Sequence, residues 1–173
     1  MSRQLTHTEI DFEKEKFPIV LITDRISSPA NLGSLLRIAD AFHIEKIMVL
    51  DSVIDLNSNR LKRTARSTEK IVDINFYDNL EEILQEINKE DYQWISLEIT
   101  EDSFPVSELK LDFTKKIALI VGEERSGVHE DLLALSKNIV HIPMFGNNSS
   151  MNVAQAAGIC LYEMTKKIID NRN

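Results

Sequence analysis

Cysteine and long apolar runs are both scarce in this sequence, and each scarcity excludes certain classes of protein. Cys160 is the single cysteine among 173 residues, so an internal disulfide is excluded and a zinc cluster lacks thiols. Because its neighbours Ile159 and Leu161 are apolar, we expect a buried structural thiol rather than a catalytic one. No stretch approaches the roughly 20 apolar residues of a membrane span. Residues 1–16 contain no apolar signal region, so we expect a cytoplasmic protein that does not enter a membrane.

Positive charge is also in short supply. The 20 Lys and Arg residues are outnumbered by 28 Asp and Glu residues, which gives a net charge of −8. This balance disfavours broad nucleic-acid binding, since a polyanion is usually met by a basic surface. One compact cluster departs from it, in the expected loop region after the second strand: Arg60, Lys62, Arg63 and Arg66. The cluster fits contact with an RNA backbone, and an ordinary solvated surface is the alternative.

Length and composition favour a single domain. Apolar residues make up 43% of the chain, which is ordinary for a globular protein with a core. Residues 1–16 are polar and lack a clear period, so we expect a mobile tail or a short surface helix there. We assign residues 17–173 to one domain.

Apolar runs and helical periods alternate along that domain. Such alternation predicts an α/β fold with a mostly parallel sheet flanked by helices. We expect Asn31 to cap the first helix and Asn152 to cap the last. The expected strands are 19–22, 46–50, 71–76, 94–97, 116–122 and 138–142, and the expected helices are 32–41, 80–88, 131–136 and 153–168.

Three loops after strands carry unusual polar residues, and ligands of open parallel sheets bind at the carboxyl ends of strands. The loops span residues 31–37, 122–127 and 147–152. Gly122 and Gly127 lie five apart, which does not fit the dinucleotide fingerprint, and no loop ends in the Gly-Lys-Ser/Thr of a P-loop. Taken alone, the third loop also fits an ordinary connection between a strand and a helix.

Taken together, the three loops resemble the three motifs of the SpoU branch of the SPOUT RNA methyltransferases. The motifs are PANLGSLLRIADAF, IVGEERSGV and IPMFGNNSSMNVAQAAGICLYE, and the resemblance runs from about Pro18 to Tyr162. It implies methyl transfer from S-adenosylmethionine to a ribose 2′-hydroxyl of structured RNA, either tRNA or rRNA. It also implies a homodimer without a metal and a SPOUT-type C-terminal trefoil knot.

The resemblance assigns roles to positions of this sequence. The catalytic set that it implies is Asn31, Arg37, Glu124, Ser150 and Asn152. The cofactor-binding set is Gly122, Ile142, Met144, Ser150 and Met151. Two positions depart from the family pattern: Met151 replaces a leucine, which conserves volume, and Glu123 stands where many members have asparagine or serine. Glu123 is expected to place a second carboxylate near the site.

The small residues of the last helix have two interpretations. Ala154, Ala157 and Gly158 permit close packing, and the family uses this region to form a dimer. Packing inside one subunit explains them nearly as well.

Arg37 is the implied catalytic residue whose role is hardest to assign. The family's arginine is often proposed as a general base, yet a guanidinium with a pKa above about 12 stays protonated. We expect Arg37 to grip a phosphate beside the target ribose, with Glu124 and Asn31 holding it in place. A solvated arginine without a role is the alternative. The acidic charge and Glu123 leave a second function open, a non-catalytic RNA-binding or assembly protein on the same fold.

Overall fold

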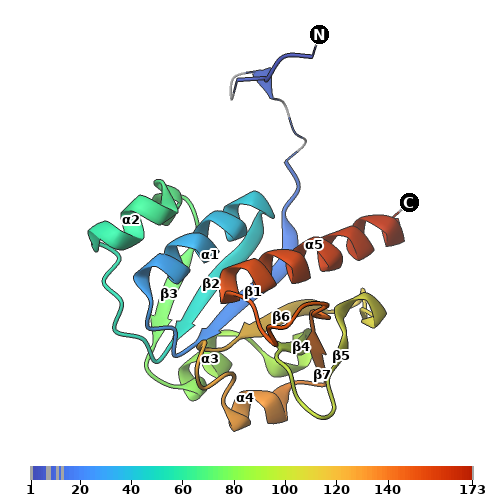
Figure 1. The fold of residues 1–173 in the computed structure, drawn as a ribbon. Coiled ribbons are helices and arrows are strands. Elements are labelled where there is room, and N and C mark those ends of the chain that lie inside the picture. Colours follow the sequence, from blue (N-terminus) through green and yellow to red (C-terminus); the bar gives the residue numbers. More distant parts are fainter. Residues whose placement is uncertain (1, 7–8, 11, 13, 173) are drawn as a thin grey trace.

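A parallel seven-stranded sheet forms the centre of the molecule (Figure 1). The computed structural model describes residues 2–6, 9–10, 12 and 14–172. The strand order is β3-β2-β1-β6-β4-β7-β5, which confirms the predicted α/β class. The strands are β1 Phe17–Asp24, β2 Ile44–Leu50, β3 Ile74–Tyr77, β4 Tyr92–Leu97, β5 Phe104–Pro105, β6 Lys116–Val121 and β7 Asn138–His141.

Helices cover both faces of the sheet because successive strand residues point to opposite sides. In β1, Ile19 and Leu21 belong to one apolar cluster, and Val20 and Ile22 belong to the other. The first cluster includes residues of α1 (Pro29–Ala41), α2 (Asn59–Ala65) and α5 (Val153–Arg172). The second includes residues of α3 (Leu80–Glu86) and α4 (Glu130–Leu135). Three 3-10 turns complete the described elements: η2 Thr68–Lys70, η3 Lys89–Asp91 and η4 Val106–Glu108.

Helix α2 corrects the prediction of a loop around the basic cluster. Arg60, Lys62 and Arg63 lie on α2, and Arg66 is its left-handed C-cap with φ 51°. Only Leu61 and Ala65 of this helix are buried, so its apolar pattern is too short to be read from the sequence.

The start of α1 is also corrected. Ser28 caps the helix, its hydroxyl accepting a hydrogen bond from the Asn31 N–H at 3.4 Å. Pro29 occupies the first turn, where its missing N–H would have had no partner in any case. Asn31 therefore lies inside α1, and its side chain does not cap the helix.

Strand β3 begins later than predicted. The strand starts at Ile74, and Ile71 precedes it with 70% of its surface exposed. The run from residue 71 is apolar enough to predict a strand, but its first residues close the turn after η2.

Cys160 confirms the expectation of a structural thiol. It lies on α5 and is fully buried in the cluster beneath α1 and α5. Burial raises the pKa of the thiol to about 12, so it stays uncharged at neutral pH.

The sheet topology determines where a ligand can bind. Strand β1 lies between β2 and β6, so the chain extends the sheet on one side of β1 and later on the other. Ligands of such sheets bind beyond the carboxyl ends of strands near this reversal. Strand order does not describe threading, so the trefoil knot stays a prediction. Among the described residues, no helix is long and apolar enough to cross a membrane.

Candidate active site

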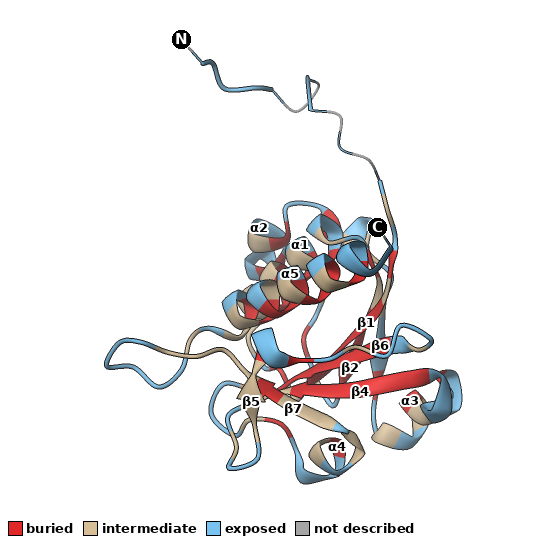
Figure 2. Ribbon diagram, turned by 90° about the vertical axis from the view of Figure 1, so that its right-hand side faces the viewer, coloured by how far each residue is buried: buried red, intermediate tan, exposed pale blue. Residues whose placement is uncertain are grey.

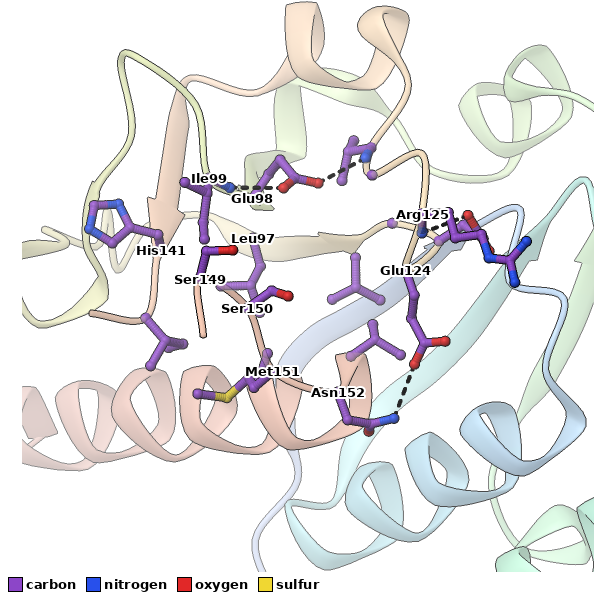
Figure 3. A pocket seen from close by; sticks show the side chains of 18 of the residues that line it. Leu97, Glu98, Ile99, Glu124, Arg125, His141, Ser149, Ser150, Met151 and Asn152 are labelled. Carbon is purple, nitrogen blue, oxygen red and sulfur yellow. Dashed lines mark hydrogen bonds between the residues drawn. The ribbon is translucent and has the colours of Figure 1, made fainter. Parts of the chain in front are cut away.

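A cavity of about 720 Å³ opens at the carboxyl ends of β4, β6 and β7 (Figure 3). Its volume lies in the range of small-molecule and cofactor sites. All five residues expected to bind a cofactor line it: Gly122, Ile142, Met144, Ser150 and Met151. Glu124 and Asn152 line it as well. The loops of the second and third motifs therefore share one cavity.

The loop from Gly122 to His129, which we call the held loop, is closed by its own side chain. The Glu123 carboxylate accepts hydrogen bonds from the N–H groups of Arg125 at 2.9 Å and Ser126 at 3.0 Å. These two bonds lower the pKa of Glu123 below its usual range. The Gly127 N–H donates to the Glu123 carbonyl at 2.8 Å. The unusual carboxylate at position 123 thus turns toward its own loop.

Two carboxylates, from the strands on either side of β6, hold the same loop from outside. Asp24, at the end of β1 and 2% exposed, accepts the His129 N–H at 2.7 Å. Glu98, directly after β4, accepts the N–H of Val128 at 3.0 Å. Arg25 pairs with Asp24 at 3.1 Å, and this pairing raises the pKa of the guanidinium. The held loop is therefore fixed by contacts within the chain itself.

Gly122 permits the closest approach within this loop. A Cβ at this position would lie 2.2 Å from the carbonyl carbon of Gly127 and 2.4 Å from the Val128 nitrogen. Both are backbone atoms, which cannot rotate away as a flexible side chain would. At Gly127, φ is +66° and a Cβ would meet the Glu98 carboxylate at 2.5 Å. Only glycine fits at either position.

Three side chains from the three motifs meet at the rim of the cavity, and we call them the junction. Glu124 Oε1 accepts hydrogen bonds from Asn31 Nδ2 at 2.6 Å and Asn152 Nδ2 at 3.1 Å. Asn152 Nδ2 also donates to Asn31 Oδ1 at 3.0 Å. Figure 3 shows the contact between Glu124 and Asn152. The second oxygen, Oε2, has no hydrogen-bond partner among the described residues.

Asn152 has a second task at the start of α5. Its Oδ1 accepts the Ala154 N–H at 3.0 Å, so the residue caps the helix as predicted. One amide therefore links the beginning of α5 to the junction.

Arg37 does not join the junction, which corrects the expectation that Glu124 and Asn31 hold it. Its side chain is exposed and makes no ion pair or hydrogen bond with any described residue. Helix geometry explains the separation, because Arg37 follows Asn31 by six residues of α1. Six residues correspond to roughly 9 Å along the axis and about 120° around it. The two side chains consequently leave α1 in different directions.

The remaining predicted residues lie on the surface. Ser150 is exposed at the cavity and makes no hydrogen bond with the described chain. The cations Arg60, Lys62, Arg63 and Arg66 are exposed on and beside α2. Gly33 brings α2 close to α1, since a Cβ there would lie 2.1 Å from Thr64 Oγ1. The basic cluster is therefore fixed relative to α1.

Comparison with known proteins agrees with this geometry. The profile of the SpoU rRNA methylase family matches residues 18–162, which contain all three motifs. The chain belongs to the SpoU rRNA methylase family.

Related SpoU proteins are longer than this chain. A 23S rRNA (guanosine-2′-O-)-methyltransferase, RlmB, of Vibrio parahaemolyticus is 28% identical over 170 residues, covering 96% of this chain and 67% of that protein. The RlmB of Ralstonia nicotianae is 30% identical over 87% of this chain and 59% of its own length. The chain thus spans about 60 to 70% of these relatives.

Solved SpoU structures share the fold. AviRb from Streptomyces viridochromogenes, solved in complex with the cofactor AdoMet (S-adenosylmethionine), gives a TM-score of 0.79 at 26% identity, over 91% of this chain and 63% of that one. The A. aeolicus TrmH/SpoU tRNA modifying enzyme gives a TM-score of 0.77 at 24% identity, over 89% of this chain and 77% of that one. The second comparison concerns the fold alone.

Sequence reasoning missed the residues that hold the loop of the second motif. Asp24 and Glu98 act on amides 105 and 30 positions away, respectively, so no local pattern reveals these contacts. The sequence did contain one indication of their role. Asp24 and Glu98 are both acidic residues at the carboxyl end of a buried strand, where the functional residues of parallel sheets gather.

Proposed function

We propose that this chain transfers the methyl group of S-adenosylmethionine to a ribose 2′-hydroxyl of ribosomal RNA. Its SpoU family membership supports the class of reaction, and the names of its RlmB relatives favour ribosomal over transfer RNA. The observation that carries the proposal is the meeting of all three motifs at one cavity through Asn31, Glu124 and Asn152. A cytoplasmic location, where ribosomal RNA is found, belongs to the same proposal.

The residues around the cavity suit S-adenosylmethionine. The group consists of an adenosine and an amino-acid tail on a sulfonium, and when bound it supplies an activated methyl group. The backbone at Gly122, Ile142, Met144 and Met151 offers N–H and C=O groups for its polar edges. Met144 and Met151 add apolar surface to the same cavity. The carboxylates of Glu98 and Glu124 favour a positively charged ligand over a neutral one.

Bound S-adenosylmethionine would supply its methyl group for an in-line displacement by the 2′-oxygen, which would leave a neutral thioether and release the hydroxyl proton. The protein has to position the oxygen and accept that proton. Glu124 offers the acceptor, because Oε1 is occupied by two amides while Oε2 is unpartnered in the described chain. Asn31 and Asn152 then orient the carboxylate.

Arg37 grips the RNA phosphate beside the target ribose in this proposal, a bidentate task for which its planar guanidinium is suited. It lies away from the junction of its own subunit, so it acts at the junction of a partner subunit in a homodimer. The dimer surface is the exposed side of α5, where Ile159 is 44% and Tyr162 61% exposed. Ala154 and Ala157 are instead buried within the subunit, and Gly158 faces Ile38 of α1.

The basic cluster on α2 supplies phosphate contacts away from the reaction centre. Its four cations make no ion pair within the described part of the chain, in contrast to Arg25 and Lys116, which do. Replacing one cation that touches a phosphate should reduce the slope of the salt dependence of RNA binding by about one unit. Binding curves of an R63A variant across salt concentrations test this assignment.

Labelled S-adenosylmethionine and ribosomal RNA from a strain lacking the gene provide the direct test. The wild-type protein should label the RNA, whereas an R37A protein should not and an E124Q protein should label it about a hundredfold more slowly. Mixing these two variants should return part of the activity, because a mixed dimer contains one site with both wild-type groups. Failure of the mixture to recover would contradict the shared site. Absence of S-adenosylmethionine binding in calorimetry would favour a non-catalytic RNA-binding protein instead.

A further inference from the structure

The segment Phe145–Ser150, which we call the open loop, is not held by the rest of the chain. It connects β7 to α5, and Figure 2 shows it standing away from the body of the molecule. All of its residues are exposed. Its backbone and side chains make no hydrogen bond with any described residue. The polar side chains of Asn147, Asn148 and Ser149 are therefore free to bind a ligand.

Phe145 is the most unusual residue of the open loop. Its side chain is 98% exposed, which leaves an entire phenyl ring in water. The preceding Met144 lines the cavity, so Phe145 directly follows a residue of the cavity wall. The other exposed aromatic side chains are less accessible to solvent: Phe12 is 80%, Tyr162 61%, Phe113 48% and Phe76 39% exposed.

The charge around Phe145 also favours an RNA ligand. The stretch from Ile142 to Tyr162 contains no Asp, Glu, Lys or Arg, although the chain as a whole has 28 acidic residues. A polyanion that approaches the open loop therefore meets no carboxylate on it. Uncharged amides and one aromatic ring are the groups that bind exposed bases in single-stranded RNA.

We propose that Phe145 stacks on a nucleobase of the RNA, at or next to the nucleotide that is methylated. This inference rests on the proposed function, because it needs RNA at the cavity rim. Ser149 and Ser150 of the open loop line the same cavity as Glu124 and Asn152, so an RNA whose ribose reaches the junction comes to the cavity that this loop borders. Stacking uses the face that every base has, so Phe145 contributes affinity and position rather than base identity. The amides of Asn147 and Asn148 can donate to and accept from the base edges.

A tryptophan at position 145 tests the stacking itself. Trp94 is the only tryptophan and is 3% exposed, so it is shielded from added RNA, and a change in the emission of an F145W protein reports on the new, exposed ring. Titration with an unmodified ribosomal RNA transcript should quench that emission. The matched control is F113W, because Phe113 lies before the amino end of β6, at the edge of the sheet opposite the cavity. Its emission should stay unchanged.

Affinity measurements complete the test. An F145A protein should bind the same transcript roughly five- to 150-fold more weakly, the range expected for one stacked base. Its dissociation constant for S-adenosylmethionine and its molecular mass in solution should equal those of the wild type. Unchanged F145W emission while the transcript binds would overturn the inference and leave the proposed function intact. Equal loss of cofactor affinity, or loss of a dimer, would overturn it too. If the wild-type protein binds no RNA, both proposals fail.

Discussion

Two loops border the same cavity and differ in how they are supported. The held loop is stabilised by its own Glu123, by Asp24 from β1 and by Glu98 after β4. The open loop, residues 145–150, has no such support among the described residues. Both loops belong to family motifs, so membership alone does not distinguish them.

The difference indicates a division of labour between cofactor and RNA. A loop that is already in place lets a small cofactor bind without a large ordering cost. A loop without internal contacts can adapt to a larger partner and becomes ordered only when that partner binds. We infer that the half of the site formed by the held loop is ready before binding and that RNA completes the other half.

The largest expected effect is the loss of cofactor binding when a methyl group is added to the held loop. In G122A the new Cβ would overlap backbone atoms of Gly127 and Val128, so the loop must move at a cost of about 3 kcal/mol. Binding of S-adenosylmethionine in calorimetry should be lost. The matched variant is G146A in the open loop, where no atom lies within 4 Å of the added Cβ. Equal effects of G122A and G146A would contradict the contrast between the loops.

Replacement of Glu124 by glutamine separates positioning from proton transfer. Glutamine keeps one carbonyl oxygen for Asn31 and Asn152 but loses the basic oxygen that the proposal assigns to the 2′-hydroxyl. We expect kcat to fall about a hundredfold with the affinity for the cofactor unchanged. Single-turnover assays measure the first quantity and calorimetry the second. If kcat is retained, another group accepts the proton.

Part of the fold and part of the site can be predicted from the sequence alone. Alternating apolar segments predicted the parallel sheet, and the motifs predicted that Asn31, Glu124 and Asn152 belong together, as the junction shows. A local pattern suffices for strands that are buried on both faces. The sequence could not place Arg37, because its direction depends on where α1 begins and how the helix turns.

The contacts that hold the held loop in place could not be predicted from the sequence for a similar reason. Contacts of Asp24 and Glu98 with distant amides depend on which strands become neighbours, and that order follows from packing of the whole sheet. Helix α2 was missed because only two of its side chains are buried. Non-local contacts and very short helices leave little trace in a single sequence.

A smaller effect, a loss of folding stability, is expected when the hydrogen bond from the end of β1 to the held loop is weakened. In D24N an amide nitrogen replaces one carboxylate oxygen and faces the N–H donors of Arg25 and His129. We expect stability to fall by about 2 kcal/mol, the range for a buried hydrogen bond to a charged group. Denaturant unfolding measures the change. The control is D40N on the exposed surface of α1, which should leave stability within about 0.5 kcal/mol of the wild type.

The smallest expected effect is a change in thermal stability when the turn that Glu123 closes is disrupted. Because the folded pKa of this carboxyl is lowered, its stabilising contribution is present above the unfolded pKa of about 4.3 and is lost as pH falls through the folded value. The difference in Tm between wild type and E123A should therefore be largest near neutral pH and should shrink in acid. A difference that grows as pH falls would contradict the assigned hydrogen bonds.

Amide hydrogen exchange of the free protein tests the contrast most directly. In the held loop, the amides of Gly127, Val128 and His129 donate to carbonyl or carboxylate oxygens at 2.8, 3.0 and 2.7 Å. We predict at least about tenfold slower exchange there than at Phe145–Ser150, with protection of the open loop appearing only when RNA is added. Equal exchange in both loops of the free protein would contradict the account.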